Sequence, residues 1–238
     1  MYKEKRILGL IPARGGSKGL PRKNILPFLE KPLIAWSIEV AYASKFLDRT
    51  IVSTDDEEIA SVARQWGAEV PFLRPSKFAE DTSPTIDAVL YTIDVLRDKG
   101  DEYDYIALIE PTSPLRKKDD IDNCIRTLLD VPETDALVTL GEVHLEHPRI
   151  MKRISNGLVR SYTDLPIIFQ RQEADPAYFP YGVLYLTKVE MLYRYKTFYP
   201  EKLIPFYIER WQNYEIDDEV DFKISEFIMK NYNSLSFF

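Results

Sequence analysis

The sequence of 238 residues has almost no cysteine and no excess of positive charge, and each shortage excludes a class of protein. Its single cysteine, Cys124, rules out an internal disulfide and indicates a reducing compartment. A formal net charge of −7 argues against a protein that binds nucleic acid by neutralising its phosphates. We therefore expect a cytoplasmic protein with no nucleic-acid partner, whose anionic ligands must meet a local cluster of cations.

Long apolar runs and metal-binding side chains are also scarce. The opening segment, MYKEKRILGLIPARGG, has too few apolar residues for a signal peptide or a membrane helix, so we expect no membrane partner. The only histidines are His144 and His147, and this pair without a nearby cysteine supplies too few ligands for zinc.

Short apolar runs that suit buried strands alternate with segments of helical periodicity. The expected strands cover residues 7–11, 50–53, 69–72, 105–110 and 136–140, and the expected helices 32–44, 56–67, 84–100 and 118–130. Such alternation implies strand–helix–strand crossovers, which place helices on both faces of a parallel sheet. The sequence therefore predicts an α/β fold with a doubly wound, mostly parallel sheet, in a single domain over residues 1–238.

The pattern changes between residues 141 and 185. This stretch carries an Asn156-Gly157 pair, which favours a hairpin turn, and then a segment rich in proline and aromatic residues. We interpret it as an excursion inserted into the α/β core. Further strands are expected at 183–186 and 203–208, and a last helix at 219–229.

The first expected strand runs directly into the segment PARGGSKGLPRKN, residues 12–24. Glycines let the backbone approach an anion closely, and Arg14, Lys18, Arg22 and Lys23 supply the positive charge that the whole chain lacks. The segment fits neither a Walker A loop nor a dinucleotide-binding glycine motif. A solvated basic turn is the alternative, but ligands of α/β sheets bind where this segment lies, so we favour a phosphate-binding loop.

The segment IPARGGSKGLPRKNI resembles the signature of the acylneuraminate cytidylyltransferase family, which includes CMP-sialate, CMP-legionaminate and CMP-pseudaminate synthetases. Segments 51–60, 72–85, 109–116 and 215–222 match the family in order and spacing, so the resemblance covers nearly the whole chain. It implies a Rossmann-like nucleotidyltransferase that uses Mg2+ to join CMP from CTP to the anomeric hydroxyl of an acidic sugar, releasing pyrophosphate.

The resemblance also assigns residues to the nucleotide. Arg14, Ser17 and Lys18 match positions that grip the triphosphate, and Arg74 and Thr85 match positions around the cytosine. The full implied nucleotide-binding set is Ala13, Arg14, Gly15, Gly16, Ser17, Lys18, Lys23, Asn24, Arg74, Thr85, Glu110, Thr112 and Ser113. By residue type and spacing alone, Arg74 is as readily a surface arginine before a proline.

Two carboxylates near the end of the chain are candidates for a metal site. Glu215 and Asp217 are two residues apart, so on an extended segment both side chains project to one face. Mg2+ takes one or two carboxylates together with substrate phosphates and water. The resemblance matches both to the family's paired metal aspartates, with Glu215 replacing the first. Asp217, Arg14 and Lys18 are the implied catalytic residues.

The resemblance places the acidic-sugar pocket in the excursion. Arg171 and Gln172 match an Arg-Gln pair at that pocket, although an arginine in a loop is often simply solvent-exposed. Tyr178 and Tyr181 lie where the family binds the sugar, and Glu110 completes the set. At these positions the family usually has asparagine, where this chain has Tyr181, and glutamine, where it has Glu110. The substrate could therefore be an ulosonic acid other than N-acetylneuraminate.

Two other functions are compatible with these observations. One is a nucleotidyltransferase for a different sugar, such as a 3-deoxy-octulosonate cytidylyltransferase. The other is a nucleotide-binding regulatory module that has lost catalysis, against which Lys18 and Asp217 speak. The resemblance further implies a homodimer formed through residues 141–185.

Overall fold

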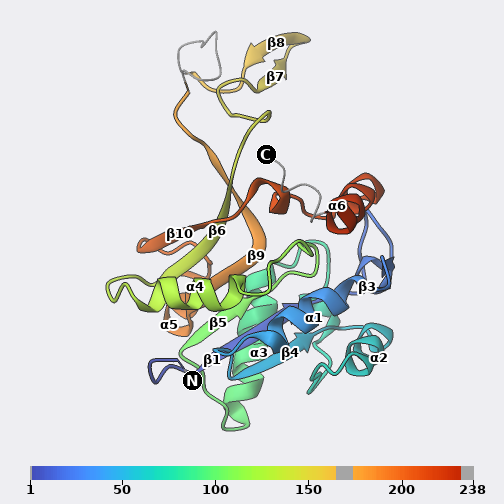
Figure 1. Cartoon of the computed structure of the whole chain (residues 1–238), viewed down its shortest axis with the longest axis vertical. Helices are drawn as coiled ribbons and strands as arrows, with labels where there is room; N and C mark the ends of the chain where they lie inside the picture. Colours follow the sequence, from blue (N-terminus) through green and yellow to red (C-terminus); the bar gives the residue numbers. More distant parts are fainter. Residues whose placement is uncertain (1, 165–173, 232–238) are drawn as a thin grey trace.

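The computed structural model describes residues 2–164 and 174–231. Within them, the centre of the molecule is a six-stranded sheet in the order β10-β6-β9-β5-β1-β4 (Figure 1). Its strands are β1 (Ile7–Pro12), β4 (Arg49–Ser53), β5 (Tyr105–Leu108), β6 (Ala136–Glu142), β9 (Tyr178–Lys188) and β10 (Leu203–Tyr207). All are parallel to one another except β9, which runs antiparallel to both β5 and β6. The predicted mostly parallel α/β fold is confirmed.

Helices cover both faces of this sheet. The helices are α1 (Leu33–Ala43), α2 (Glu57–Gln65), α3 (Thr85–Asp98), α4 (Asp120–Leu129), α5 (Val189–Tyr195) and α6 (Glu219–Asn231). Apolar side chains of α1, α2 and α4 pack into one buried cluster with the sheet, and those of α3 and α5 pack into another. The four helices expected between strands and the last helix are all present. The short helix α5 was not expected.

The chain reverses its direction of travel across the sheet at β1. It first moves outward from β1 to β4, and then returns to β5 on the other side of β1. The carboxyl ends of the adjacent strands β1 and β5 therefore mark the point where the strand order reverses, and ligands of such sheets bind at this point. This is where the fold positions a ligand site.

A third apolar cluster joins the two ends of the chain. Phe28 and Leu33, from the segment after the basic loop, are buried against Ile216 and Phe222. Phe28 lies on the short strand β2 (Pro27–Phe28), which pairs with β3 (Lys31–Pro32). Burial of these side chains holds the segment before α6 beside the loop that follows β1, because separating them would expose the whole apolar cluster to water.

The strand expected at residues 69–72 is not formed. Only Glu69 is paired, in a single bridge to Ile51, with the Val52 N–H donating to the Glu69 carbonyl. Pro71 has no N–H to donate, so a longer ladder at this edge cannot be satisfied. The chain instead runs on to the short 3-10 helix η2 (Ser76–Phe78).

Between β6 and β9 the chain leaves the sheet and forms a projection at the top of Figure 1. We call the described residues of this stretch, 143–164 and 174–177, the arm. It contains the hairpin of β7 (Lys152–Ser155) and β8 (Leu158–Ser161). Asn156 and Gly157 have φ angles of 53° and 74°, as a two-residue type I′ turn requires, and the predicted hairpin is confirmed.

Candidate active site

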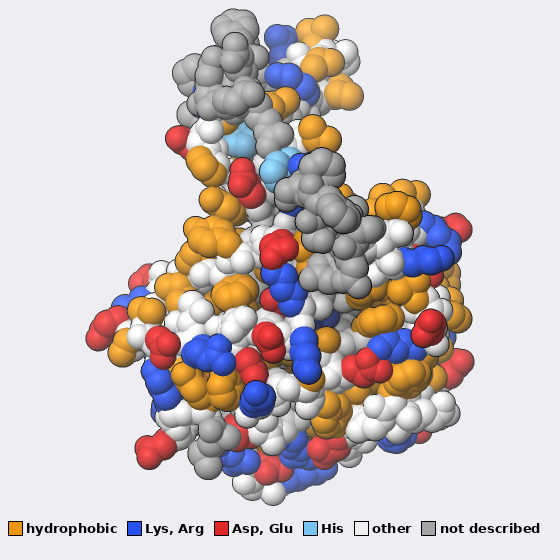
Figure 2. Space-filling model, in the orientation of Figure 1, with side chains coloured by type: hydrophobic (Ala, Val, Ile, Leu, Met, Phe, Trp, Pro, Cys, Tyr) orange, Lys and Arg blue, Asp and Glu red, His pale blue; other side chains and the backbone are white. Residues whose placement is uncertain are grey.

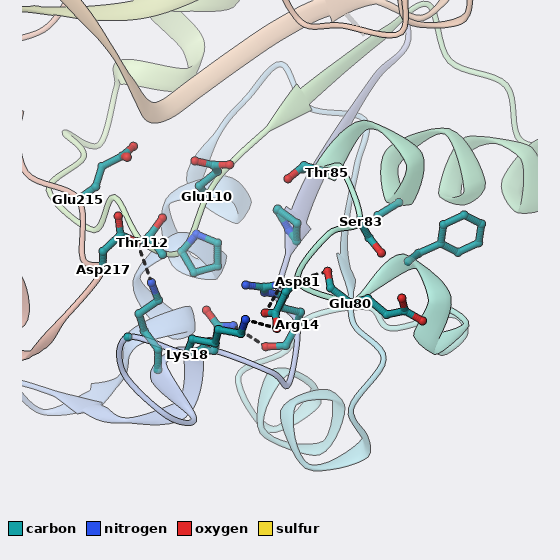
Figure 3. Close-up of a pocket in the computed structure, with 18 of the residues that line it drawn as sticks. Arg14, Lys18, Glu80, Asp81, Ser83, Thr85, Glu110, Thr112, Glu215 and Asp217 are labelled. Carbon is teal, nitrogen blue, oxygen red and sulfur yellow. Dashed lines mark hydrogen bonds and ion pairs between the residues drawn. The ribbon is translucent and has the colours of Figure 1, made fainter. Parts of the chain in front are cut away.

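A cleft of about 560 Å³ opens at the carboxyl ends of β1 and β5 (Figure 3). Its walls come from the loop after β1, from the segment between η2 and α3, from the segment after β5 and from the segment before α6. The predicted residues that line it are Arg14, Ser17, Lys18, Lys23, Asn24, Arg74, Thr85, Glu110, Thr112, Glu215 and Asp217. The basic loop and the two carboxylates, some 200 positions apart in the chain, therefore share one cleft.

One side of the cleft is basic, and a carboxylate neutralises part of it. Lys18 lies 2.7 Å from a carboxylate oxygen of Asp81, and Arg14 lies 3.3 Å from the other. Arg14 also donates to the backbone carbonyl of Glu80 at 3.1 Å. The hydrogen bond from Lys18 holds the pKa of the Asp81 carboxyl below its usual value.

Lys23 links the two ends of the chain within the cleft. Its ammonium group donates to the backbone carbonyl of Ile216 at 2.5 Å and to the Asp217 carboxylate at 3.3 Å. Asn24 donates to the backbone carbonyl of Arg14 at 3.1 Å, which fixes the bend of the basic loop. These two residues therefore hold the cleft together in addition to lining it.

Arg74 is buried at the cleft with an incomplete set of partners. It is only 5% exposed, its Nε has no hydrogen-bond partner, and its Nη2 lies 3.8 Å from Asp55. Burial lowers the pKa of its guanidinium. A buried donor without an acceptor is costly, so a ligand that offers an acceptor here would gain the free energy of satisfying it. The surface arginine that residue type and spacing allowed is therefore wrong.

The first turn of α3 adds positive potential to the same space. Thr85 begins the helix and Ala88 follows one turn later, and both line the cleft. No side chain caps this helix end, since Pro84 occupies the N-cap position. Backbone N–H groups at a helix N-terminus favour anions, so α3 and the basic loop favour the same kind of ligand.

The opposite side of the cleft is acidic. Burial, with the charge of Glu215 as the next cause, raises the pKa of the Glu110 carboxyl to about 7. The Ser113 hydroxyl donates to Glu215 Oε1 at 2.9 Å, and the Gly182 N–H donates to the same oxygen. A Cβ at position 182 would overlap Glu110 and crowd Glu215 Oε1, so a larger residue here would push these two acidic side chains out of their present positions.

Arg116 supports this acidic side from beneath. It is 7% exposed, and its guanidinium donates to the backbone carbonyls of Glu110 at 2.5 Å and Gly182 at 2.6 Å, and to the Ser37 hydroxyl at 2.8 Å. Burial lowers its pKa to about 10. Sequence reasoning missed this role, although Arg116 closes the segment 109–116 that carries the family resemblance.

The carboxylates fit a magnesium ion by the chemistry of their donors. Among the described residues no group of three or more His, Cys, Asp or Glu side chains could hold a metal by itself. Glu215 and Asp217 nevertheless supply two hard oxygen ligands, and Mg2+ commonly completes its shell with water and substrate phosphates. The mutual repulsion of carboxylates here would be relieved by a cation.

Several predicted residues do not line this cleft. Ala13 is buried in the core, Gly16 is exposed, and the Gly15 N–H donates to Asp55 at 3.1 Å. The Ser113 hydroxyl donates a hydrogen bond to Glu215. Arg22, expected to add charge to the loop, turns away to Asp56 and Glu58 at the start of α2.

The residues predicted for the sugar are divided between two places and an undescribed segment. Glu110 lines the cleft, whereas Tyr178 and Tyr181 line a separate hollow of about 550 Å³ at the base of the arm. Arg171 and Gln172 lie outside the described residues. Their role in sugar binding stays a prediction.

Sequence reasoning also missed Asp81, which faces Arg14 and Lys18 across the cleft (Figure 3). It lies within the segment 72–85 that resembles the family. A single carboxylate in a polar loop gives no indication in the sequence that it belongs to a site. Only the fold brings this loop back over the cations.

A doubly wound sheet with an anion-favouring cleft at its switch point is the arrangement typical of α/β proteins that bind nucleotides. A family model described as "Cytidylyltransferase" matches residues 8–235, and the chain belongs to that family. The prediction of an enzyme of the cytidylyltransferase type is confirmed at this level.

Curated relatives agree with the family. CMP-N,N'-diacetyllegionaminic acid synthase of Legionella pneumophila is 33% identical over 231 residues, covering 94% of this chain and 97% of the relative. N-acylneuraminate cytidylyltransferase of Escherichia coli is 27% identical over 96% of this chain, which spans only 53% of that relative. Pseudaminic acid cytidylyltransferase of Campylobacter jejuni is 46% identical over 47% of this chain and 48% of the relative.

Solved structures support the fold. A CMP:2-keto-3-deoxy-manno-octonic acid synthetase complexed with CTP has a TM-score of 0.72 at 17% identity, covering 95% of this chain and 99% of that one. A 4-diphosphocytidyl-2C-methyl-D-erythritol synthase has a TM-score of 0.70 at 12% identity, with the same coverage. At such low identity these likenesses describe the fold alone.

Proposed function

We propose that this chain transfers CMP from CTP to the anomeric hydroxyl of a nonulosonic acid, with Mg2+ as cofactor and pyrophosphate as the second product. One observation carries the proposal: the glycine-lined basic loop and the carboxylates 215 and 217 line a single cleft. The relatives named for legionaminic, N-acylneuraminic and pseudaminic acid support the class of acceptor.

Each wall of the cleft has a role in this reaction. The sugar hydroxyl oxygen attacks the α-phosphorus of CTP as the bond to the pyrophosphate oxygen breaks. Arg14, Lys18 and the N-terminus of α3 offset the negative charge of the phosphates. Arg74 offers its unpartnered Nε–H to the nucleotide. Little covalent chemistry is required of the protein, so positioning and charge supply most of the acceleration.

Magnesium would be held by Glu215 and Asp217 together with phosphate oxygens, and when bound it supplies positive charge against the leaving pyrophosphate. Asp217 is our candidate to accept the proton of the sugar hydroxyl, because its side chain is 87% exposed at the mouth of the cleft. Glu215 is held by Ser113 and Gly182, which suits a fixed ligand more than a mobile base.

The sugar would lie at the acidic side of the cleft, toward the arm. Glu110 lines the cleft, and the Tyr181 hydroxyl is close enough to Glu215 that this charge adds to burial in raising the pKa of the tyrosine. We include Arg171, Gln172 and Tyr178 in the sugar pocket on the family resemblance.

We propose that the active form is a cytoplasmic homodimer assembled through the arm. The hairpin of the arm exposes Ile154 by 80%, Val159 by 69% and Leu158 by 55%, and Figure 2 shows hydrophobic side chains gathered at this end of the molecule. Exposed apolar side chains on one small element indicate a protein contact. Light scattering at working concentration tests this, and a monomer would contradict it.

Within the described residues, no helix combines the length and apolar character of a membrane span. The reaction is tested on the purified chain by pyrophosphate release with CTP, UTP, GTP or ATP and a panel of acidic sugars. We expect release with CTP and a nonulosonic acid, in the presence of Mg2+ only.

The two alternative functions give different results in this assay. Release with CTP and 3-deoxy-octulosonate, and with no nonulosonic acid, would replace our choice of acceptor. Binding of CTP without release under any sugar would identify a non-catalytic nucleotide-binding module.

A further inference from the structure

Asp81 lies on a short turn that crosses the basic side of the cleft. Its two carboxylate oxygens contact different cations, Lys18 at 2.7 Å and Arg14 at 3.3 Å (Figure 3). The same two cations are the ones that the proposed function gives to the phosphates of the nucleotide. A carboxylate that bridges two cations uses donors that a phosphate would use.

The turn is anchored on both sides of Asp81. On one side, the Phe78 ring stacks on Tyr91 of α3, with ring centroids 4.8 Å apart. On the other side, the Ser83 hydroxyl donates to the Lys77 carbonyl at 2.6 Å, and the Ser83 N–H donates to the Glu80 carbonyl at 3.1 Å. These contacts keep the Asp81 carboxylate over the cleft without burying it, since it remains 42% exposed.

The contacts of Asp81 are weak enough to exchange. Exposed ion pairs contribute little free energy because water screens both partners, and here the side chain of Lys18 is 76% exposed. A phosphate chain carries several charges and presents more oxygens to the same donors. It can therefore displace Asp81, but it must give up part of its binding free energy to do so.

We propose that Asp81 competes with the phosphates of the nucleotide for Arg14 and Lys18. This competition lowers the affinity for CTP, and it assists the departure of pyrophosphate because Asp81 forms its ion pairs with the two cations again as the product leaves. This inference rests on the proposed function and deepens it, since it assigns to one residue outside the predicted site a role in binding and release. No bond is made or broken by Asp81.

The test compares Asp81→Asn with the wild type by calorimetric titration of CTP and, separately, of inorganic pyrophosphate. The substitution keeps the size of the side chain and removes its charge. We expect both dissociation constants to fall about threefold to tenfold, as loss of competing exposed ion pairs predicts. The difference from wild type should shrink as salt is added, because salt screens exposed charges.

Glu80→Gln is the matched control. It removes one negative charge from the neighbouring residue of the same turn, while Glu80 contacts Arg14 through its backbone carbonyl and not its carboxylate. A general effect of charge would strengthen binding equally in both variants. Competition by Asp81 predicts a clearly larger change in Asp81→Asn, together with stronger inhibition of turnover by added pyrophosphate.

The outcomes separate this inference from the proposed function. If Asp81→Asn and the wild type bind CTP equally, or if Glu80→Gln matches Asp81→Asn, the competitor role is wrong and the proposed function stands. If Asp81→Asn binds more weakly, Asp81 supports the nucleotide and the inference is again overturned. If no variant, with thermal unfolding confirming its fold, binds CTP at all, the proposed function fails and this inference fails with it.

Discussion

The cleft and the arm place their side chains in opposite ways. In the cleft, side chains of opposite charge lie beside one another, as Lys18 lies beside Asp81 and Lys23 beside Asp217. On the arm, apolar side chains such as Ile154 and Val159 face outward. A charged cleft satisfied within one chain can bind a ligand by itself, whereas an exposed apolar hairpin gains free energy only from another surface. The cleft thus favours a small charged ligand, and the hairpin favours contact with another apolar surface, as we propose for the dimer.

The largest effect is expected inside the cleft, from Asp217→Asn. Loss of the carboxylate removes a proposed metal ligand and our candidate base, so turnover should fall on the order of a thousandfold. Binding of CTP should persist, because Arg14, Lys18 and Arg74 remain. The two quantities are measured by pyrophosphate release and by calorimetry.

Asp218→Asn serves as the control for this prediction. Asp218 accepts hydrogen bonds from the N–H groups of Val220 and Asp221 at the start of α6, and it does not line the cleft. This variant should keep most of its turnover. Near-normal turnover in Asp217→Asn would remove that residue from the mechanism.

The next effect is expected on the arm. Ile154 and Val159 are cross-strand partners in the hairpin, so both lie on one face. Ile154→Lys combined with Val159→Glu places opposite charges in register and should leave the hairpin folded. Since each apolar side chain contributes roughly 1.5–3 kcal/mol when buried, the dissociation constant of the dimer should rise about a hundredfold or more.

The control for the arm uses the neighbouring pair, Arg153 and Arg160, which face the other side of the same hairpin. Serine at both positions should leave the dimer intact. Dimerisation is measured by light scattering over a dilution series. If the Ile154 and Val159 double variant remains a dimer at every dilution, the face assigned to the contact is wrong.

The smallest effect concerns the partly buried carboxyl of Glu110. Its pKa of about 7 in the folded protein lies above its usual value of 4.5. Between these pH values the folded protein holds a proton that the unfolded chain has lost, so the unfolding free energy contributed by this group falls as pH rises. This contribution is complete below pH 4.5 and is lost once the pH passes about 7.

Glu110→Gln cannot titrate and should lack this part of the pH dependence, which amounts to at most about 1.4 kcal/mol per pH unit. The measurement is urea unfolding in metal-free buffer at several pH values between about 5 and 8. Glu219→Gln, at an exposed carboxylate on α6, is the control. Parallel curves for wild type and Glu110→Gln would contradict the raised pKa.

Those parts of the fold that depend on a few neighbouring residues could be predicted from the sequence. Helical periodicity located α1 to α4, and the Asn156-Gly157 pair located the hairpin, because turn geometry depends on the two residues themselves. The wrong prediction of a strand at residues 69–72 also came from a local signal. The apolar run there resembles a strand, but Pro71 prevents pairing. The antiparallel direction of β9 has no local signal, because it follows from where the chain re-enters the sheet.

The sequence by itself determined which chemical groups this protein carries and in what order, including the glycine-lined basic loop and the paired carboxylates. Only the tertiary structure decided which of them meet. Gly182 lies between Glu110 and Glu215, and Asp81 lies on Arg14 and Lys18, because the sheet order and the apolar cluster around Phe28 and Ile216 bring distant segments to one edge. Burial of apolar surface drives that assembly. Because this force is non-directional and does not depend on which charged side chains come together, the contacts among the charges could not be predicted from sequence spacing.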